Sequence, residues 1–571
     1  MNRKDQRRLQ KARRNRQQAS PKGNGSEPRT ADIDAALGQV TALLQSGHPG
    51  GARELSQALL AEHPEDPRAL NLGAIACFQT DDATTATALL EAAIKRQPDF
   101  VDAHNNLGNV LKARGDFLRA ETAYRHAIEC APGYFDAHFN LGIVLEAMGR
   151  PGEARETYGK ALDIRPDYLP AYLNTGNAQK ALGKFDEALD YYRWVLEVEP
   201  RNVDALNNTG AVYYQLTRFD DAESTYRKAL EIDAEHADTL YNLGVLLQET
   251  ERFDQAVDTY QRAVAARPHY TECHVNLGYT LHQLGRLEEA RASYERAIEL
   301  DPDNAQAQVN LGDLFLARGD PDAALGICDD FLAHHAGDTG ILAFKTIALR
   351  ETGDVNGARE LADTERFLHR TELRVPKAFA DRDAFNTALA DHICAHPSLV
   401  DAPASNATRH GKHSGELLVE PKGPMAGWEA RLREAIEEYR GALPGDPSHP
   451  FVDSLPERYR LTAWSVVLER QGHQIPHIHP SAWLSGVYYV ALPGAVAASS
   501  EDTAGWIEFG QPPDHYHGKA PPELVLEKPR EGLLVLFPSY FYHRTIPFDT
   551  TGRRISIAFD VVPYRGPWQG Q

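Results

Sequence analysis

A spacing of 34 residues runs through most of the first two thirds of the chain and restricts its fold more than any other feature. Alanine follows each glycine of this period after twelve residues, and tyrosine follows six of the seven glycines after sixteen. Proline recurs with the same period, and Ala234 once takes its place. Such a period indicates stacked units that bury their apolar faces against one another. The glycines are Gly108, Gly142, Gly176, Gly210, Gly244, Gly278 and Gly312.

Each repeated position has a mechanical reason. Glycine and alanine let the two helices of one unit approach closely, tyrosine fills the space beside them, and proline ends a helix at the turn into the next unit. The pattern resembles the tetratricopeptide repeat. The resemblance implies an all-α superhelix with a concave binding groove, with nine units over about residues 31–336 and a degenerate capping unit near 340–369.

An asparagine stands two residues before every glycine of the series, on the first helix of each unit. Asparagine is a mediocre helix former, so the helix itself does not require it. A side-chain amide can pair with a peptide group, and a row of amides would hold an extended protein segment by its backbone. The alternative is that each asparagine bonds within the turn of its own repeat. The row resembles the asparagine ladder of the O-linked N-acetylglucosamine transferases, and its members are Asn106, Asn140, Asn174, Asn208, Asn242, Asn276 and Asn310.

Charge is distributed unevenly along the chain. Residues 1–16 hold eight Lys or Arg against Asp5 alone, whereas the whole chain has a formal net charge of −21. The body is therefore strongly acidic and repels phosphate backbones, which argues against general nucleic-acid binding. We expect residues 1–30 to form a basic disordered tail. This tail either contacts an acidic surface, such as RNA or anionic lipid, or is simply solvated.

The sequence favours a reducing, cytoplasmic setting. The five cysteines are widely spaced and form no CxxC pair, which argues against a disulfide framework or a zinc ribbon. No apolar run approaches the roughly 18 residues that a membrane span needs. The N-terminus also lacks the apolar core of a signal peptide.

The 34-residue period ends near residue 370, and a second domain is expected over 375–571. A helix is expected around 428–439. Short runs rich in Val, Tyr and Ile then follow, separated by Gly and Pro, which predicts a jelly-roll domain with flanking helices behind the repeat array of 31–370. The predicted strands are 461–468, 484–492, 506–509, 524–527, 533–537 and 555–562.

Two sequence clusters in this second domain carry chemistry. The first contains His477 and His479, which share a face if the strand continues through them. In the second, a strand ends at His543 and the next strand opens with Arg554 and Ser556. A His-x-carboxylate pair with a distant His is the iron site of many non-haem oxygenases. An Arg with a nearby Ser is suited to bind a carboxylate by two prongs.

The order of these clusters resembles the 2-oxoglutarate/iron(II) dioxygenases, and most closely a bacterial group that carries HxHP, SGxYY, FPS and RxSIAF segments behind tetratricopeptide repeats. The resemblance implies a double-stranded β-helix with iron(II) and 2-oxoglutarate as cofactors. It implies His477 and His543 as metal ligands, and His479 is retained as the third ligand because histidine is common at this place within the bacterial group. It also implies that Arg554 and Ser556 hold the distal carboxylate of 2-oxoglutarate, with Tyr489 as a second contact.

One position departs from the superfamily, because His479 stands where an Asp or Glu is usual. A three-histidine site lacks the negative charge of the carboxylate. The alternatives are that Glu508 substitutes, that the third position is open, or that the site is inactive. His473, His515 and His517 are interpreted as structural.

The sequence thus predicts a hydroxylase that binds a protein or peptide in its repeat groove and oxidises it at the barrel. Two alternatives stay open. The repeats bind a partner while the barrel is catalytically silent, or the enzyme oxidises a small molecule and the repeats only localise it.

Overall fold

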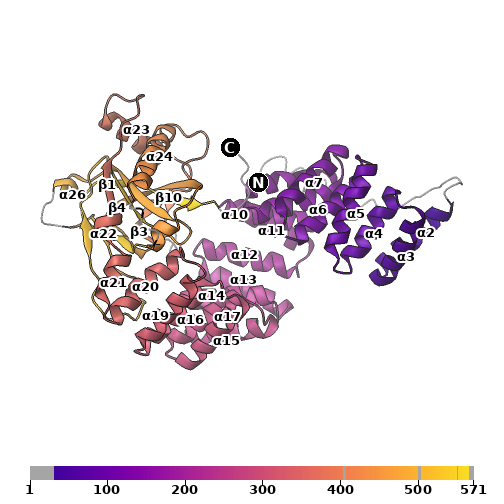
Figure 1. Ribbon diagram of the computed structural model, residues 1–571, viewed down its shortest axis with the longest axis horizontal. Helices are drawn as coiled ribbons and strands as arrows, with labels where there is room; N and C mark the ends of the chain where they lie inside the picture. The colour runs from indigo at the N-terminus through magenta and orange to yellow at the C-terminus, as the bar shows by residue number, and fades with distance from the viewer. Residues whose placement is uncertain are drawn as a thin grey trace. The chain divides into compact units, whose positions relative to one another are not determined.

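The computed structural model describes residues 31–402, 407–443, 445, 448–498, 503–549 and 551–564 (Figure 1). Its contacts divide the chain into two compact units, Met1–Leu246 and Leu247–Gln571. The predicted basic tail at 1–30 lies outside the described residues. The predicted boundary near 370 marks the end of the repeat pattern, whereas the compact units group the last repeats with the sheet. The division into 31–370 and 375–571 remains a prediction.

Within the described residues the repeats are all-helical, as predicted, and they form nine antiparallel helix pairs followed by a shorter tenth. The pairs run from α2 (Ala31–Gln45) and α3 (Pro49–Glu62) through α4 (Pro67–Phe78), α5 (Ala83–Arg96), α6 (Val101–Ala113), α7 (Phe117–Cys130), α8 (Phe135–Ala147), α9 (Pro151–Ile164), α10 (Leu169–Ala181), α11 (Phe185–Val198), α12 (Val203–Gln215), α13 (Phe219–Ile232), α14 (Ala237–Glu249), α15 (Phe253–Ala266), α16 (Thr271–Gln283), α17 (Leu287–Leu300), α18 (Ala305–Ala317) and α19 (Pro321–Leu332) to α20 (Thr339–Glu351) and α21 (Val355–Leu361).

The glycines of the period lie against the tyrosines, as the sequence pattern predicts. A Cβ added to Gly108 would lie 2.5 Å from the Tyr124 ring, and the same contact with a tyrosine recurs at Gly142, Gly176, Gly210 and Gly278. The ninth repeat has Cys328 in place of tyrosine. There the ring of Phe344, from the first helix of the next repeat, takes this place and would lie 2.5 Å from a Cβ added to Gly312. The close helix approach therefore depends on glycine throughout.

The remaining chain forms an antiparallel sheet with flanking helices, consistent with a jelly roll. In order along the sheet its main strands are β1, β8, β5, β10, β4, β9, β6 and β7, while β2 pairs with β3 and β3 with β4. The elements are α22 (Thr364–Phe367), β1 (His369–Glu372), α23 (Arg382–Cys394), β2 (Val400–Asp401), β3 (Thr408–His413), α24 (Met425–Ala442), α25 (Pro450–Asp453), β4 (Tyr459–His477), β5 (Leu484–Ala491), α26 (Gly494–Ala498), β6 (Ile507–Phe509), β7 (Val525–Glu527), β8 (Leu533–Pro538), β9 (His543–Thr545) and β10 (Arg554–Pro563).

Alternation along β10 separates a core face from a cavity face. Ile557 and Phe559 are fully buried, and Trp428 of α24 packs edge-on against the Phe559 ring at 5.7 Å. Because successive side chains of a strand point to opposite faces, Arg554, Ser556 and Asp560 point the other way. The long strand β4 pairs first with β10 and then with β9, with a register shift between Gln474 and His477. This shift brings the end of β4 beside β9.

The last repeats and the sheet share one hydrophobic core. Phe344 of α20 and Phe367 of α22 belong to the same buried cluster as Leu534 and Phe537 of β8. The hydroxyl of Tyr540 donates a hydrogen bond to the Leu361 carbonyl at 2.6 Å. Among the described residues, no helix has the length and apolar character needed to cross a membrane.

Candidate active site

Three imidazoles meet where β4 ends and β9 begins. His477 and His543 are directly paired across these two strands. His479 lies two residues beyond β4, and its backbone N–H donates to the Ser539 carbonyl at 3.0 Å. One ring nitrogen from each of the three histidines lies within 4.8 Å of those of the other two. The structure therefore brings together the three residues that the sequence singled out as ligands.

The hydrogen bonds of the His477 and His543 rings fix which nitrogen of each ring is free to bind a metal. Nδ1 of His477 lies 2.8 Å from the Ile475 carbonyl oxygen, and Nδ1 of His543 lies 3.0 Å from that of Phe541. A carbonyl oxygen only accepts, so both Nδ1 atoms carry the hydrogen and both Nε2 atoms keep a lone pair. This is the orientation in which neutral histidines bind metals.

Burial keeps two of these rings uncharged. Desolvation, together with the neighbouring imidazoles, lowers the pKa of His477 to about 4 and lowers the pKa of His543 far below its usual range. Neutral imidazole is the ligand form, because a proton on Nε2 would occupy the lone pair that a metal needs.

His479 has a carboxylate partner that the sequence analysis missed. Its Nδ1 lies 2.9 Å from Oδ1 of Asp560, and the same carboxylate accepts a 2.6 Å hydrogen bond from the Ser485 hydroxyl. Ser485 also bonds to Ser539 at 2.8 Å. Asp560 lies four residues after Ser556 in β10, so strand alternation places it on the cavity face. This alternation is the sequence signal from which Asp560 could have been predicted to lie in the cavity.

Arg554 is a buried cation in a setting without counter-charge. Only 1 % of it is exposed, and within the described chain its hydrogen-bond partners are the Gly505 carbonyl and the Ser556 hydroxyl, both at 3.3 Å. No carboxylate of the described residues forms an ion pair with it. Burial lowers the pKa of Arg554. Arginine nevertheless stays protonated in proteins. A buried unpaired charge is costly, so the site is suited to an anionic group.

Tyr489 lies beside this guanidinium. Residues Ser556 and Tyr489 are paired across β10 and β5, and the Arg554 guanidinium carbon is 5.0 Å from the centre of the Tyr489 ring. Burial raises the pKa of Tyr489 to about 12. Its hydroxyl approaches Arg554 closely enough to affect the charge balance, but it has no hydrogen-bond partner of good geometry within the described chain. An oxyanion beside Arg554 would supply one.

One cavity of about 410 Å³ connects the two groups of residues. His477, His479 and His543 line it together with Arg554 and Ser556. Its size suits a metal ion and a small dicarboxylate side by side, with the imidazoles and the guanidinium as separate binding points. The donor set of this structure therefore fits both iron(II) and 2-oxoglutarate.

The alternative ligand Glu508 is engaged elsewhere. Its Oε1 accepts a hydrogen bond from Arg544 Nε at 2.6 Å, and it does not belong to the histidine cluster. His473 is bonded to the Gln471 carbonyl through Nδ1, at 3.0 Å. His515 and His517 lie on the loop between β6 and β7, and neither lines the histidine cavity.

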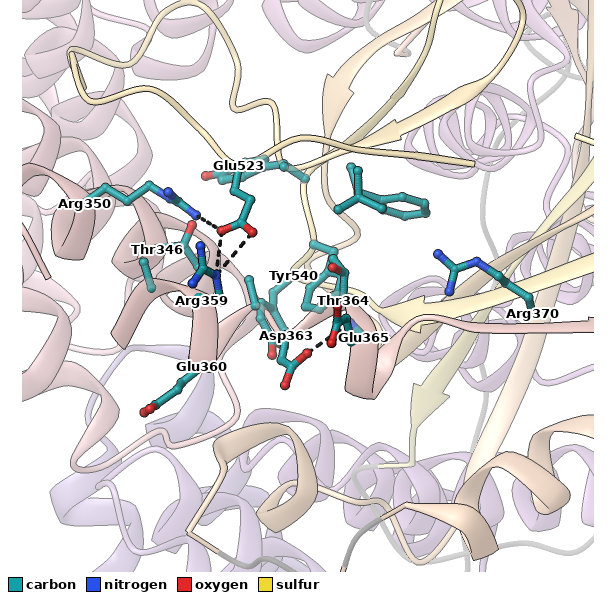
Figure 2. Close-up of a pocket in the computed structure, with 17 residues that line it drawn as sticks. Thr346, Arg350, Arg359, Glu360, Asp363, Thr364, Glu365, Arg370, Glu523 and Tyr540 are labelled. Atoms are coloured by element: carbon teal, nitrogen blue, oxygen red, sulfur yellow. Dashed lines mark hydrogen bonds and ion pairs between the residues drawn. The ribbon is translucent and has the colours of Figure 1, made fainter. Parts of the chain in front are cut away.

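A larger cavity, of about 680 Å³, shares no lining residue with the histidine cavity. Figure 2 shows Glu523 between Arg350 and Arg359, with ion-pair distances of 3.4 and 3.0 Å. The charged side chains shown in this larger cavity therefore already neutralise one another. We therefore assign the candidate active site to the smaller cavity.

Four of the seven asparagines of the row bond to the preceding repeat, whereas Asn310 accepts a hydrogen bond from Gln306 of its own helix at 2.7 Å. Each of the seven asparagines is half-buried, and several side-chain amides donate to an asparagine of the preceding repeat. These bonds are Asn106 to Asn71 at 2.9 Å, Asn140 to Asn105 at 3.4 Å, Asn208 to Asn177 at 3.0 Å and Asn242 to Asn207 at 2.9 Å. An amide that donates once keeps further donor and acceptor capacity.

Comparison with known families agrees with this architecture. A model described as "Putative 2OG-Fe(II) oxygenase" matches residues 462–560. Models described as tetratricopeptide repeats match residues 37–99, 99–167, 135–199, 201–269 and 278–319. No curated protein matches the chain significantly.

Solved structures resemble parts of the chain. MamA is 27 % identical over 29 % of this chain and 90 % of its own, with a TM-score of 0.27. A tetratricopeptide repeat protein from Parabacteroides merdae is 14 % identical over 44 % and 98 %, with a TM-score of 0.39. YrrB, described as a TPR protein with an unusual peptide-binding site, is 23 % identical over 32 % and 95 %, with a TM-score of 0.26.

Fold and site together define a helical-repeat protein joined to a jelly-roll domain with a histidine cluster. The family matches make the assignment more specific. The chain is a tetratricopeptide-repeat protein with a C-terminal domain of the 2-oxoglutarate/iron(II) oxygenase family.

Proposed function

We propose that this protein is an iron(II)/2-oxoglutarate-dependent hydroxylase and that its repeats bind the protein or peptide that it oxidises. The observation that carries the enzymatic half is the pairing, in one cavity, of three convergent imidazoles with a buried arginine that has no described carboxylate partner. One group suits a metal and the other suits an organic anion. A structural role for either group would not require the two to share a cavity.

In this proposal His477, His479 and His543 hold the metal through Nε2, while the carbonyl oxygens and Asp560 fix their rings. Arg554 and Ser556 bind the distal carboxylate of 2-oxoglutarate, and the Tyr489 hydroxyl donates to the same carboxylate. Iron(II) bound there, with dioxygen, supplies the conversion of 2-oxoglutarate to succinate and CO₂ coupled to the conversion of a substrate C–H into C–OH.

The side chains of the domain position and shield this reaction. Arg554 fixes the orientation of the cosubstrate because its two-pronged contact resists rotation. Burial of the guanidinium strengthens the contact, since little water competes for the carboxylate. The stacking of Trp464 on His479, at 5.6 Å between ring centres, excludes water from one side of that ring.

The repeat half of the proposal rests on the asparagine row. The seven side chains are half-buried and still partly accessible, and they recur at the same place on the first helix of each repeat. Amide groups at a constant spacing suit the peptide backbone rather than particular side chains. An extended, sequence-tolerant segment is the ligand that this chemistry favours.

The enzymatic proposal is tested with the full-length protein loaded anaerobically with iron(II). After addition of oxygen and 2-oxoglutarate labelled at the carboxyl group that is lost, the released CO₂ is counted. We expect release above background for the unaltered protein and for His473→Ala, and none for His543→Ala. If the folded, iron-loaded protein neither binds 2-oxoglutarate nor releases CO₂, the jelly roll is a silent scaffold and the proposal is wrong.

A further inference from the structure

A second cluster of metal-binding side chains lies outside the jelly-roll cavity, on the loop between β6 and β7. His517 of this loop meets Asp313 of α18: its backbone N–H donates to Oδ1 at 2.7 Å, and its Nδ1 lies 2.9 Å from Oδ2. The His517 ring also stacks on His282 of α16, at 4.7 Å between ring centres and 19° between planes. All three residues belong to the same compact unit.

The possible ligand atoms of this cluster lie within the same distance of one another as those of the jelly-roll histidines. One ligand atom from each of His282, Asp313 and His517 lies within 4.8 Å of the other two. His282 is 7 % exposed and Asp313 is 6 % exposed, whereas the His517 side chain is 41 % exposed. The cluster is therefore walled by the repeat helices and open to solvent on the side of the loop.

An unsatisfied nitrogen points to a ligand. Nε2 of His282 is buried and has no hydrogen-bond partner among the described residues. Leaving such a group unpaired costs about 1–3 kcal/mol. Asp313, also buried, has no Lys or Arg partner in the described chain, and its carboxylate is paired with the His517 ring alone. A cation would satisfy the free nitrogen and neutralise the carboxylate at once.

We propose that His282, Asp313 and His517 form a second metal site, for a divalent first-row transition metal of the zinc type. Two imidazoles and one carboxylate are a common donor set for such ions, with water in the fourth, solvent-facing position. The site shares no residue with the cavity that holds His477 and His543.

Such a metal would fasten the β6–β7 loop to the repeats that flank the jelly roll. The loop has other anchors, since Glu351 accepts hydrogen bonds from the backbone N–H groups of Lys519 and Ala520. From the same loop, the Tyr516 ring packs edge-on against Tyr542 at 6.3 Å, and Tyr542 directly precedes His543. The effect of the metal would thus be local stiffening next to β9.

The test uses the full-length protein with His477→Ala and His543→Ala, which silences the jelly-roll histidines. Co²⁺ alone is titrated in, and its visible absorption reports coordination by nitrogen and oxygen ligands. We expect one Co²⁺ per chain, displaced by Zn²⁺. His517→Ala or Asp313→Asn in this background should weaken binding by more than about 100-fold, because loss of even an outer partner of a ligand weakens metal binding about 10- to 100-fold.

His515→Ala is the matched control, because His515 lies on the same loop but outside the cluster. It should bind Co²⁺ as the background does. His517 is largely exposed, so its substitution is not expected to unfold the protein, and circular dichroism checks this. If the background itself fails to fold, the unaltered protein should lose one equivalent of Zn²⁺ upon His517→Ala. Equal binding by the His517 and His515 variants, or no binding by the folded background, would refute the site.

Discussion

Nδ1 of His479 lies 2.9 Å from Oδ1 of Asp560, so a carboxylate stands directly behind the one histidine that replaces the usual acidic ligand. In the proposed metal site, the negative charge would therefore lie on the partner of the ligand histidine and not on the ligand itself. A carboxylate that accepts from a ligand histidine orients the ring and raises its basicity. In the proposed site, this pair would offset in part the missing charge of a ligand set that is otherwise neutral.

The first prediction concerns this pair. Asp560→Asn keeps the size of the side chain but removes its charge, and we expect the affinity for iron(II) to fall about 10- to 100-fold. Anaerobic titration with a competing chelator measures the change. Asp549→Asn is the control, because Asp549 is an exposed partner of Arg470. Equal affinities of the two variants would show that Asp560 does not tune the ligand.

The second prediction separates metal from cosubstrate. Arg554→Lys retains a positive charge but loses the two-pronged contact, so the half-saturating 2-oxoglutarate concentration should rise about 10- to 100-fold, since a charge-assisted hydrogen bond contributes about 1.5–3 kcal/mol. Iron affinity should not change. The neighbouring Arg553 is exposed and pairs with Glu469 at 3.3 Å, so Arg553→Lys is the control. An unaltered 2-oxoglutarate requirement in the Arg554 variant would contradict the assigned carboxylate pocket.

The third prediction tests whether His479 binds the metal in place of the usual acidic ligand. His479→Ala should lose iron, whereas His479→Asp should retain it by restoring the common triad. The new carboxylate would face Asp560, and two close carboxylates repel each other. The double variant His479→Asp, Asp560→Asn should therefore bind iron more tightly than His479→Asp alone. The unaltered protein, His479→Asp, Asp560→Asn and the double variant form a double-mutant cycle, in which iron affinity is measured by titration. Simple additivity of the two changes in binding free energy would exclude this coupling.

Much of this molecule follows from sequence periodicity. The helix pairs follow from the 34-residue period, and the predicted strands 484–492 and 533–537 correspond to β5 and β8 within a residue or two. The strands β1, β2, β3 and β9 were not predicted. They have two to six residues and gain their order from neighbours that are distant in sequence, which a local pattern does not encode.

The candidate site was predictable where a motif carried it. His477 and His543 stand in recognisable segments, whereas Asp560 acts through a partner 81 residues away. His517 was interpreted as structural, because its partners His282 and Asp313 lie on repeat helices more than 200 residues earlier in the chain. Only the packing of the β6–β7 loop against those helices brings the three together.

The fourth prediction concerns the asparagine row. Replacing Asn174, Asn208 and Asn242 together by alanine should weaken binding of an extended peptide selected on the full-length protein. The structure adds a cost in stability, since Asn208 and Asn242 donate to the preceding repeat, and each lost bond is worth about 0.5–1.5 kcal/mol.

A control distinguishes these two effects. Asn207→Ala removes the same bond that Asn242 makes, but it leaves the row intact. If the row binds peptide backbone, Asn242→Ala should weaken peptide binding more than Asn207→Ala at similar stability. Calorimetric titration measures the binding, and urea unfolding measures the stability. Equal peptide affinities of the two variants would show that the row only links neighbouring repeats and does not bind peptide.

The last prediction concerns the turn between the two helices of a repeat. Gly183 has a φ of 70° in this turn, and Thr217 occupies the equivalent place one repeat later with a φ of 56°. The left-handed region costs an L-residue about 1–2 kcal/mol, and a β-branched side chain is especially unsuited to it. Glycine avoids this strain. Its greater freedom in the unfolded chain, however, lowers the free energy of unfolding by about 0.4–1 kcal/mol.

Thr217→Gly should therefore stabilise its repeat by about 0.5–1 kcal/mol, since relief of strain exceeds the added entropy of unfolding. The Thr217 side chain is exposed, and among the described residues its hydroxyl bonds only to the adjacent Leu216 carbonyl, so little packing is lost. The reciprocal Gly183→Thr should destabilise by a similar amount. Urea midpoints followed by far-ultraviolet circular dichroism measure both changes, and a shift of both variants in the same direction would rule out backbone strain as the cause.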